Sequence, residues 1–88
     1  MPLKESELLK DALELIDYLI KDSTLPRNVK AAISRAKDEL LKKDEPLDVR
    51  ISSATYIIDD VGNDVNLPMH ARSELWNLAS RLEEAKNK

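Results

Sequence analysis

Three segments of the chain share one pattern: LPRNVKAAIS (25–34), EPLDVRISSA (45–54) and LPMHARSELW (67–76). In each segment the proline is followed by two residues, a small apolar residue and then a basic residue. Proline is tolerated in the first turn of a helix, because the amide hydrogen that it lacks would be unpaired there. The three segments therefore predict helices that begin near residues 25, 45 and 67.

The residues around these prolines refine the helix boundaries. Thr24, Asp44 and Asn66 stand two positions before the prolines, and their side chains are of the kind that accepts hydrogen bonds from free N–H groups in a first helical turn. Gly62 is predicted to end the third helix in the left-handed conformation. The resulting map has four helices, over about 4–21, 25–42, 46–61 and 67–86.

The composition favours an all-α fold. Apolar residues make up 42% of the 88 residues and charged residues 35%. The chain has a single glycine, whereas a β-rich fold needs many turns, in which glycine is common. A chain of this length forms one domain with a small core. Because the predicted connections are short, sequential helices should be antiparallel. We therefore expect residues 1–88 to form a single antiparallel four-helix bundle of up-and-down topology.

An internal repeat supports this map. LIDYLIKDSTLP (15–26) aligns without a gap with IIDDVGNDVNLP (57–68), an offset of 42 residues. The match indicates two related helical hairpins. It also fits two stacked helical repeats, but solenoids need about three repeats for stability. The closed bundle is therefore the preferred interpretation.

The predicted helices differ in their apolar faces and in charge. The apolar residues of 25–42, 46–61 and 67–86 follow the helical period in single stripes, whereas those of 4–21 cover a wider arc. The wide arc means either deep burial or contact with a second chain, on the flank that carries Leu13 and Ile20. The first and third helices are acidic and the second and fourth are not, which favours weak attraction between neighbours.

Several function classes are disfavoured by the residues that are missing. The chain has no cysteine, and its polar N-terminus and short apolar runs predict neither a signal peptide nor a membrane span. We expect a cytosolic protein. Its net charge of −3 gives no global attraction for nucleic acid. No motif for a phosphate loop, a nucleophile or a metal occurs, so we predict no enzyme, no cofactor and no metal.

Two sets of residues could carry chemistry but have simpler explanations. His70 is the only histidine, and no residue at a matching spacing supplies a nucleophile or an orienting carboxylate, so a packing or capping role is favoured. Asp59, Asp60, Asn63 and Asp64 surround Gly62, but they do not match the calcium-loop pattern. A solvated helix end is the preferred interpretation of this acidic cluster.

A basic face is predicted on the second helix. Arg27, Lys30 and Lys37 line one exposed side, where they could contact phosphates. No aromatic residue is interleaved for base stacking. An RNA- or ribosome-associated accessory protein is therefore the alternative function, behind a non-catalytic protein-interaction module.

The candidate interface consists of large side chains that lie off the apolar stripes. On the fourth helix these are Met69, Arg72 and Trp76, and on the third they are Val49 and Tyr56. Trp, Arg and Met are enriched in protein interfaces. Two further interpretations stay open: Trp76 could cover a groove between helices, and Tyr56 could simply stand in water. The surplus apolar surface leads us to expect self-association, through the fourth helix before the third.

The chain resembles the small archaeal protein family UPF0147, which is known only as an uncharacterised family. The resemblance covers most of the chain and is strongest in LPRNVKAA (25–32) and NLPMHARSELWNLASRLE (66–83). The residues that match the family pattern are Pro68, His70, Arg72, Trp76, Leu82 and Glu83. The resemblance implies a four-helix bundle with a bromodomain-like mirror topology, and it implies no activity.

Overall fold

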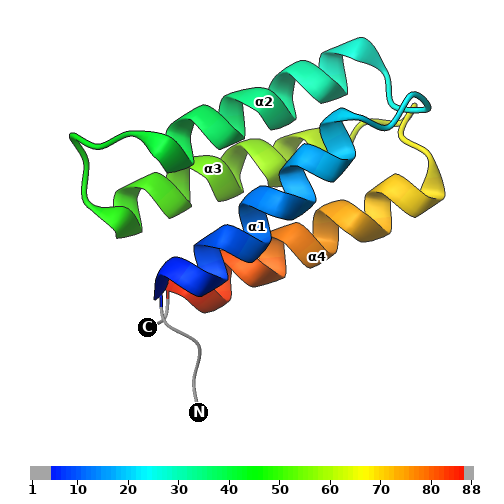
Figure 1. Ribbon diagram of the computed structural model, residues 1–88. Coiled ribbons are helices and arrows are strands. Elements are labelled where there is room, and N and C mark those ends of the chain that lie inside the picture. Colours follow the sequence, from blue (N-terminus) through cyan, green and yellow to red (C-terminus); the bar gives the residue numbers. More distant parts are fainter. Residues whose placement is uncertain (1–4, 87–88) are drawn as a thin grey trace.

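The computed structural model describes residues 5–86, and its side chains from residue 9 onward. Four α-helices account for most of this range: α1 (Glu5–Ile20), α2 (Arg27–Leu41), α3 (Leu47–Val61) and α4 (Met69–Lys86). No strand occurs between residues 5 and 86, so the predicted all-α class is confirmed. Consecutive helices run in opposite directions (Figure 1).

The helices pack in a ring. Within residues 5–86, α1 contacts α2 and α4, and α3 contacts the same two helices, but α1 does not contact α3 and α2 does not contact α4. The loops at 21–26 and 62–68 lie at one end of the bundle, and the loop at 42–46 lies at the other (Figure 1). The mirror handedness implied by the family resemblance stays a prediction. None of the described helices combines the length and apolarity that crossing a bilayer requires.

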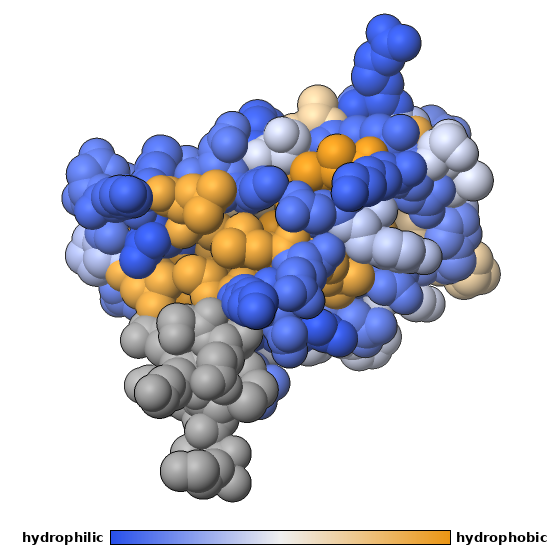
Figure 2. All heavy atoms as spheres, in the orientation of Figure 1, coloured by the Kyte–Doolittle hydropathy of each residue, from blue (hydrophilic) through white to orange (hydrophobic). Residues whose placement is uncertain are grey.

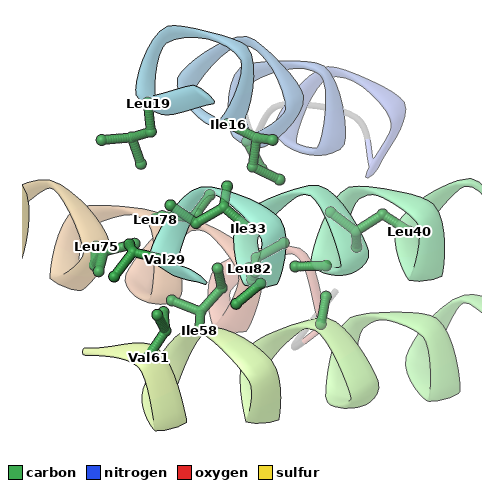
Figure 3. Close-up of a cluster of buried hydrophobic side chains, with 14 of the residues drawn as sticks. Ile16, Leu19, Val29, Ile33, Leu40, Ile58, Val61, Leu75, Leu78 and Leu82 are labelled. Atoms are coloured by element: carbon green, nitrogen blue, oxygen red, sulfur yellow. The ribbon is translucent and has the colours of Figure 1, made fainter. Parts of the chain in front are cut away.

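The core is built entirely from aliphatic side chains. Every side chain that is buried between residues 9 and 86 is apolar, and the largest of them point from all four helices toward a shared centre (Figure 3). The stripes predicted for the second, third and fourth helices supply most of this core. Its members are Ala12, Ile16, Leu19, Leu25, Val29, Ala32, Ile33, Ala36, Leu40, Ile51, Ala54, Ile58, Val61, Leu67, Ala71, Leu75, Leu78, Leu82 and Ala85.

The wide apolar arc of α1 is only partly buried. Ala12, Ile16 and Leu19 are fully enclosed. Their neighbours on the same helix are half-buried at the edge of the core, namely Leu9, Leu13, Leu15 and Ile20. Figure 2 shows apolar side chains gathered on the face where α1 crosses the bundle, with charged residues between them.

The predicted helix starts are one or two residues too early. α2, α3 and α4 each begin at the residue after the proline, and the proline carbonyl accepts the first intrahelical hydrogen bond. The N–H groups of Lys30, Arg50 and Arg72 donate these bonds at 3.1, 3.1 and 3.0 Å. Pro26 has an extended backbone (φ −58°, ψ 151°), and Pro46 is nearly identical (φ −59°, ψ 151°). Each of these two prolines is therefore the N-cap residue rather than the first helical residue.

The predicted side-chain caps are wrong for the same reason. With proline at the N-cap, Thr24 and Asp44 stand two residues outside their helices, beyond the reach of the first-turn N–H groups. No side-chain hydrogen bond caps α2 or α3. The Thr24 hydroxyl donates to Asp22 instead, at 2.6 Å. Asn66 has the same position before Pro68, and its N–H donates to Asp64 at 2.8 Å.

The predicted left-handed conformation of Gly62 is also wrong. Its φ of −65° and ψ of −16° lie in the right-handed helical region. The N–H of Gly62 still donates to the carbonyl of Ile58, and the next two bonds, from Asn63 and Asp64, span three residues instead of four. α3 therefore ends by tightening into a narrower turn, which satisfies its last carbonyls without a positive φ.

The internal repeat extends over both hairpins. α2 and α4 begin 42 positions apart, at Arg27 and Met69. Core residues recur at this offset, although the sequence match is weak outside the dozen aligned positions. The corresponding buried pairs are Ala12 and Ala54, Ile16 and Ile58, Leu19 and Val61, Leu25 and Leu67, Val29 and Ala71, Ile33 and Leu75, Ala36 and Leu78, and Leu40 and Leu82.

The two loops at one end of the bundle are linked by equivalent hydrogen bonds. One oxygen of Asp22 accepts the N–H of Thr24 at 2.9 Å, and one oxygen of Asp64 accepts the N–H of Asn66. The second oxygen of each carboxylate reaches the other hairpin. Asp64 accepts a bond from the Asn28 amide at 2.9 Å. Asp22 lies 3.0 Å from Nε2 of His70, the residue 42 positions after Asn28.

The hydrogen bonds around Asp22 favour its ionised carboxylate and determine that Nε2 of His70 carries a hydrogen. The Thr24 hydroxyl, the Thr24 N–H and His70 lower the pKa of Asp22 from 3.8 to about 2. The Thr24 hydroxyl gives its hydrogen to Asp22, so its oxygen, 3.2 Å from Nε2 of His70, can only accept. Nε2 therefore carries a hydrogen. Bonds from Asn66 and Asn28 lower the pKa of Asp64 in the same way.

We expect Leu78→Ala to lower the free energy of unfolding by about 2–5 kcal/mol, because Leu78 is fully buried and the change leaves a cavity. Urea unfolding followed by circular dichroism measures the loss. Met69→Ala on the same helix is the control, since Met69 is 80% exposed and should cost less than about 0.5 kcal/mol. A loss below about 1 kcal/mol for Leu78→Ala would contradict its place in the core.

Asp22→Asn should destabilise the fold at neutral pH, and the difference from wild type should shrink in acid. The folded-state pKa of Asp22 is depressed to about 2, so its stabilising effect is complete above about pH 4 and is lost as the pH falls through 2. Urea midpoints between pH 2 and pH 7 measure this, with the exposed Asp38→Asn as control. A difference that does not change with pH would rule out the predicted linkage.

Candidate interaction surface

All five residues of the predicted interface lie at the surface. Trp76 and Tyr56 are each 75% exposed, Met69 is 80% exposed and Val49 is 43% exposed. Arg72 is exposed as well. Helical spacing correctly predicted that these side chains lie on the outside, because the buried stripe of each helix determines which of its sides faces water.

The structure joins the patches on the third and fourth helices into one groove. A hollow of about 370 Å³ is lined by Trp76, Arg72 and their neighbours on α4, together with the end of α3. A second hollow of about 390 Å³ is lined by Tyr56. Asp59 and Glu83 line both hollows, which therefore adjoin each other. We call this combined feature the α3–α4 groove.

Helical spacing explains how the groove is lined. Arg72, Trp76, Ser80 and Glu83 recur at intervals of four, four and three residues along α4 and therefore share one side of it. Tyr56 and Asp59 are three residues apart on α3. Asp59 and Glu83 line both hollows, whereas Trp76 lines only the first and Tyr56 only the second.

The floor of the groove is apolar and shallow. Ile58 and Leu75 are core residues, and Ala79 is a half-buried small residue that leaves space above it. Trp76 borders this space but remains three-quarters exposed. Trp76 therefore lines a groove between helices, as one interpretation held, but is not buried in it. Met69 and Val49 do not line either hollow.

Two carboxylates in the groove lack a charged partner. No ion pair within 4 Å involves Asp59 or Glu83 among the described residues. Basic groups lie at the ends of the groove instead. Arg72 donates to the carbonyl of Asp64 at 3.4 Å, and Lys86 lines the opposite end. Glu83 is not among the predicted interface residues, although it lies two helical turns from Trp76 on the same helix.

The predicted basic face of α2 is interrupted. Arg27 is exposed and Lys30 is half-buried, but the Lys37 ammonium lies 2.7 Å from a carboxylate oxygen of Asp17 on α1. This pair, with the Asp11–Arg81 pair at 3.9 Å between α1 and α4, follows the predicted charge pattern of the helices. Lys37 is thus less available to an external phosphate than the sequence suggested.

The acidic cluster near Gly62 is divided among different surroundings. Asp64 holds the loop, Asp59 lines the α3–α4 groove, and Asp60 lines a separate hollow beside α2. Between residues 5 and 86 no three His, Asp or Glu side chains are grouped so that they could hold a metal ion. His70 is committed to the loop links, where its orienting carboxylate, Asp22, comes from 48 residues earlier in the chain.

Comparison with known proteins identifies the family. Residues 2–85 match the model of the uncharacterised protein family UPF0147. The chain belongs to this family. The UPF0147 protein MJ1419 of Methanocaldococcus jannaschii is 41% identical over 80 residues, which cover 91% of this chain and 86% of the relative. The UPF0147 protein of Archaeoglobus fulgidus is 43% identical over 75 residues, covering 85% of both chains.

Solved structures share the fold. The crystal structure of a UPF0147 protein from Thermoplasma acidophilum matches with a TM-score of 0.86 at 33% identity, over 90% of this chain and 93% of that chain. The crystal structure of MMP1188, a protein of unknown function, matches with a TM-score of 0.90 at 34% identity, over 94% of both chains. The family resemblance and the four-helix fold expected from the sequence are therefore confirmed.

Acrylamide should quench the fluorescence of Trp76 nearly as strongly as that of N-acetyltryptophanamide, because the side chain is 75% exposed. The chain has a single tryptophan, so the signal reports this site alone. Protection at high dilution would contradict the exposed position. Protection that grows with protein concentration would show that a second copy covers the groove.

Proposed function

We propose that this chain is a non-catalytic, cytosolic protein-interaction module, and that its α3–α4 groove receives a segment of another protein. The observation that carries the proposal is the exposure of Trp76 and Tyr56 beside two adjoining hollows. Exposed aromatic side chains keep apolar area in contact with water, and burying it is favourable. Tryptophan, tyrosine and arginine also supply much of the binding energy in protein interfaces.

The shape of the groove supports a segment rather than a small molecule as the occupant. The two hollows are open to solvent along the length of two antiparallel helices, and their floor is only partly apolar. Small-molecule sites enclose most of the ligand surface in a concave pocket. An extended or helical segment fits a long open groove between helices, in which side chains at regular intervals act as anchors.

The alternative role in RNA binding has less support. It relied on Arg27, Lys30 and Lys37, and Lys37 is paired with Asp17 at 2.7 Å. No aromatic side chain interleaves with this basic face in the sequence. A second copy of the chain is the other candidate occupant of the groove, and the experiment below separates it from a different protein.

Photo-crosslinking from inside the groove tests the proposal. With p-benzoylphenylalanine in place of Tyr56, we expect a specific protein from native extract to be captured. The same amino acid in place of Tyr18 should not capture that protein, because Tyr18 is comparably exposed, at 63%, but does not line the groove.

The captured protein must then bind when purified. We expect Trp76→Ala to weaken its affinity by ten-fold or more, which corresponds to about 1.4 kcal/mol or more. Tyr18→Ala should leave the affinity unchanged. The same captured proteins from both positions, or equal affinity for Trp76→Ala and wild type, would refute the proposal. Capture of a second copy alone would replace it with self-association.

A further inference from the structure

We propose that the segment received by the α3–α4 groove places a lysine or arginine side chain between Trp76 and Tyr56, on the carboxylates of Asp59 and Glu83. This inference rests on the proposed function and specifies the chemistry of the partner. It comes from comparing the groove with the equivalent position in the first hairpin.

The first hairpin contains the cation that the second hairpin lacks. At the offset of 42 residues, Asp59 corresponds to Asp17 and Ala79 corresponds to Lys37. The ammonium of Lys37 lies 2.7 Å from Asp17, so the first hairpin neutralises its own carboxylate across the two helices. Ala79 cannot do so. The methyl side chain leaves both a space and an unpaired charge at Asp59.

The aromatic residues are also specific to the second hairpin. Trp76 corresponds to Ser34 and Tyr56 corresponds to Glu14. The face of an aromatic ring attracts a cation, tryptophan most strongly, and more so when docking removes water. Trp76 lines the same hollow as Asp59 and Glu83, so a cationic side chain in that hollow has an aromatic ring and carboxylates as neighbours.

Asp59 and Glu83 are the reason why the docked segment needs a basic side chain. In the free chain Asp59 and Glu83 are exposed to water. A docked segment would cover them, and a charge removed from water without a partner is costly. An apolar occupant would satisfy the aromatic rings but leave both carboxylates unpaired. A basic side chain satisfies both.

The ends of the groove limit how basic the segment can be. Arg72 lies at one end and Lys86 at the other. These charges repel further lysines or arginines next to the central one. We therefore infer a single basic residue flanked by neutral or acidic residues, which differs from the uniformly basic sequence that general attraction to an acidic protein would select.

Display selection of random short peptides on the immobilised wild-type protein tests the inference, with Trp76→Ala protein used for counter-selection. Selected peptides should share one central lysine or arginine. Replacing a central lysine by norleucine, which has the same straight chain without the charge, should weaken binding by about ten-fold. Asp59→Asn with Glu83→Gln should weaken it similarly. Asp60→Asn with Glu84→Gln is the matched control, because these neighbouring carboxylates lie outside the groove.

The Ala79→Lys substitution provides an independent test of Asp59 as the partner of the basic side chain. It reproduces the Lys37–Asp17 arrangement in the second hairpin and should weaken the same peptides by about ten-fold, because the new ammonium occupies Asp59. Ala79→Met adds similar bulk without charge and should weaken them less. Unchanged binding to Ala79→Lys would refute Asp59 as the partner of the cation.

The selection also separates this inference from the proposed function. If the selected peptides need Trp76 and Tyr56 but lack a basic residue, the inferred basic residue is refuted and the proposed interaction groove still stands. The same conclusion holds if the peptides bind equally well to the Asp59→Asn, Glu83→Gln protein. If no selected peptide depends on Trp76 or Tyr56, both proposals fail.

Discussion

Asp22 and Asp64 each accept hydrogen bonds from both hairpins, and this pair of links fixes where α2 and α4 begin relative to each other. One oxygen of each carboxylate holds its own loop, and the other contacts Asn28 or His70 in the first turn of the helix from the opposite loop. A helix repeats every 3.6 residues, so a start held at one residue is compatible with only one set of inward-facing side chains. The loops hold α2 and α4 in the register that their buried stripes require.

The consequences can be followed along α2 and α4. Ala36 and Leu78 occupy equivalent places in the core, and so do Leu40 and Leu82. The same phase turns Ser34 and Trp76 outward. Inside, both hairpins must fill one shared aliphatic core, so equivalent positions stay apolar and differ mainly in size. Outside, no such restriction applies, and serine in one hairpin can correspond to tryptophan in the other. Differences between the hairpins accumulate on the surface, and the α3–α4 groove is one of their results.

Much of the fold could be predicted from local patterns. Periodic apolar residues identified the buried stripes, and the prolines located three helix starts to within two residues, because both effects act over a few neighbouring positions. The Asp22–His70 link could not be predicted in this way, since it joins residues 48 positions apart. The repeat did align Asp22 with Asp64, but the partner residues lie beyond the stretch of clear similarity. The groove could not be predicted in this way either. Helical spacing predicted that Tyr56 and Trp76 each lie on the outer side of their own helix, but only the packing of α3 on α4 brings them together.

The contrast between Lys37 and Ala79 indicates how an open groove can be selective without being costly to the free protein. In the first hairpin a pair at the surface joins two helices, and such pairs add at most about 1 kcal/mol to stability. Losing the equivalent lysine in the second hairpin therefore costs little, because water solvates Asp59 while the groove is empty. The unpaired carboxylate becomes unfavourable only when a partner covers it. Discrimination then arises at the moment of docking, through the penalty on any segment that brings no positive charge.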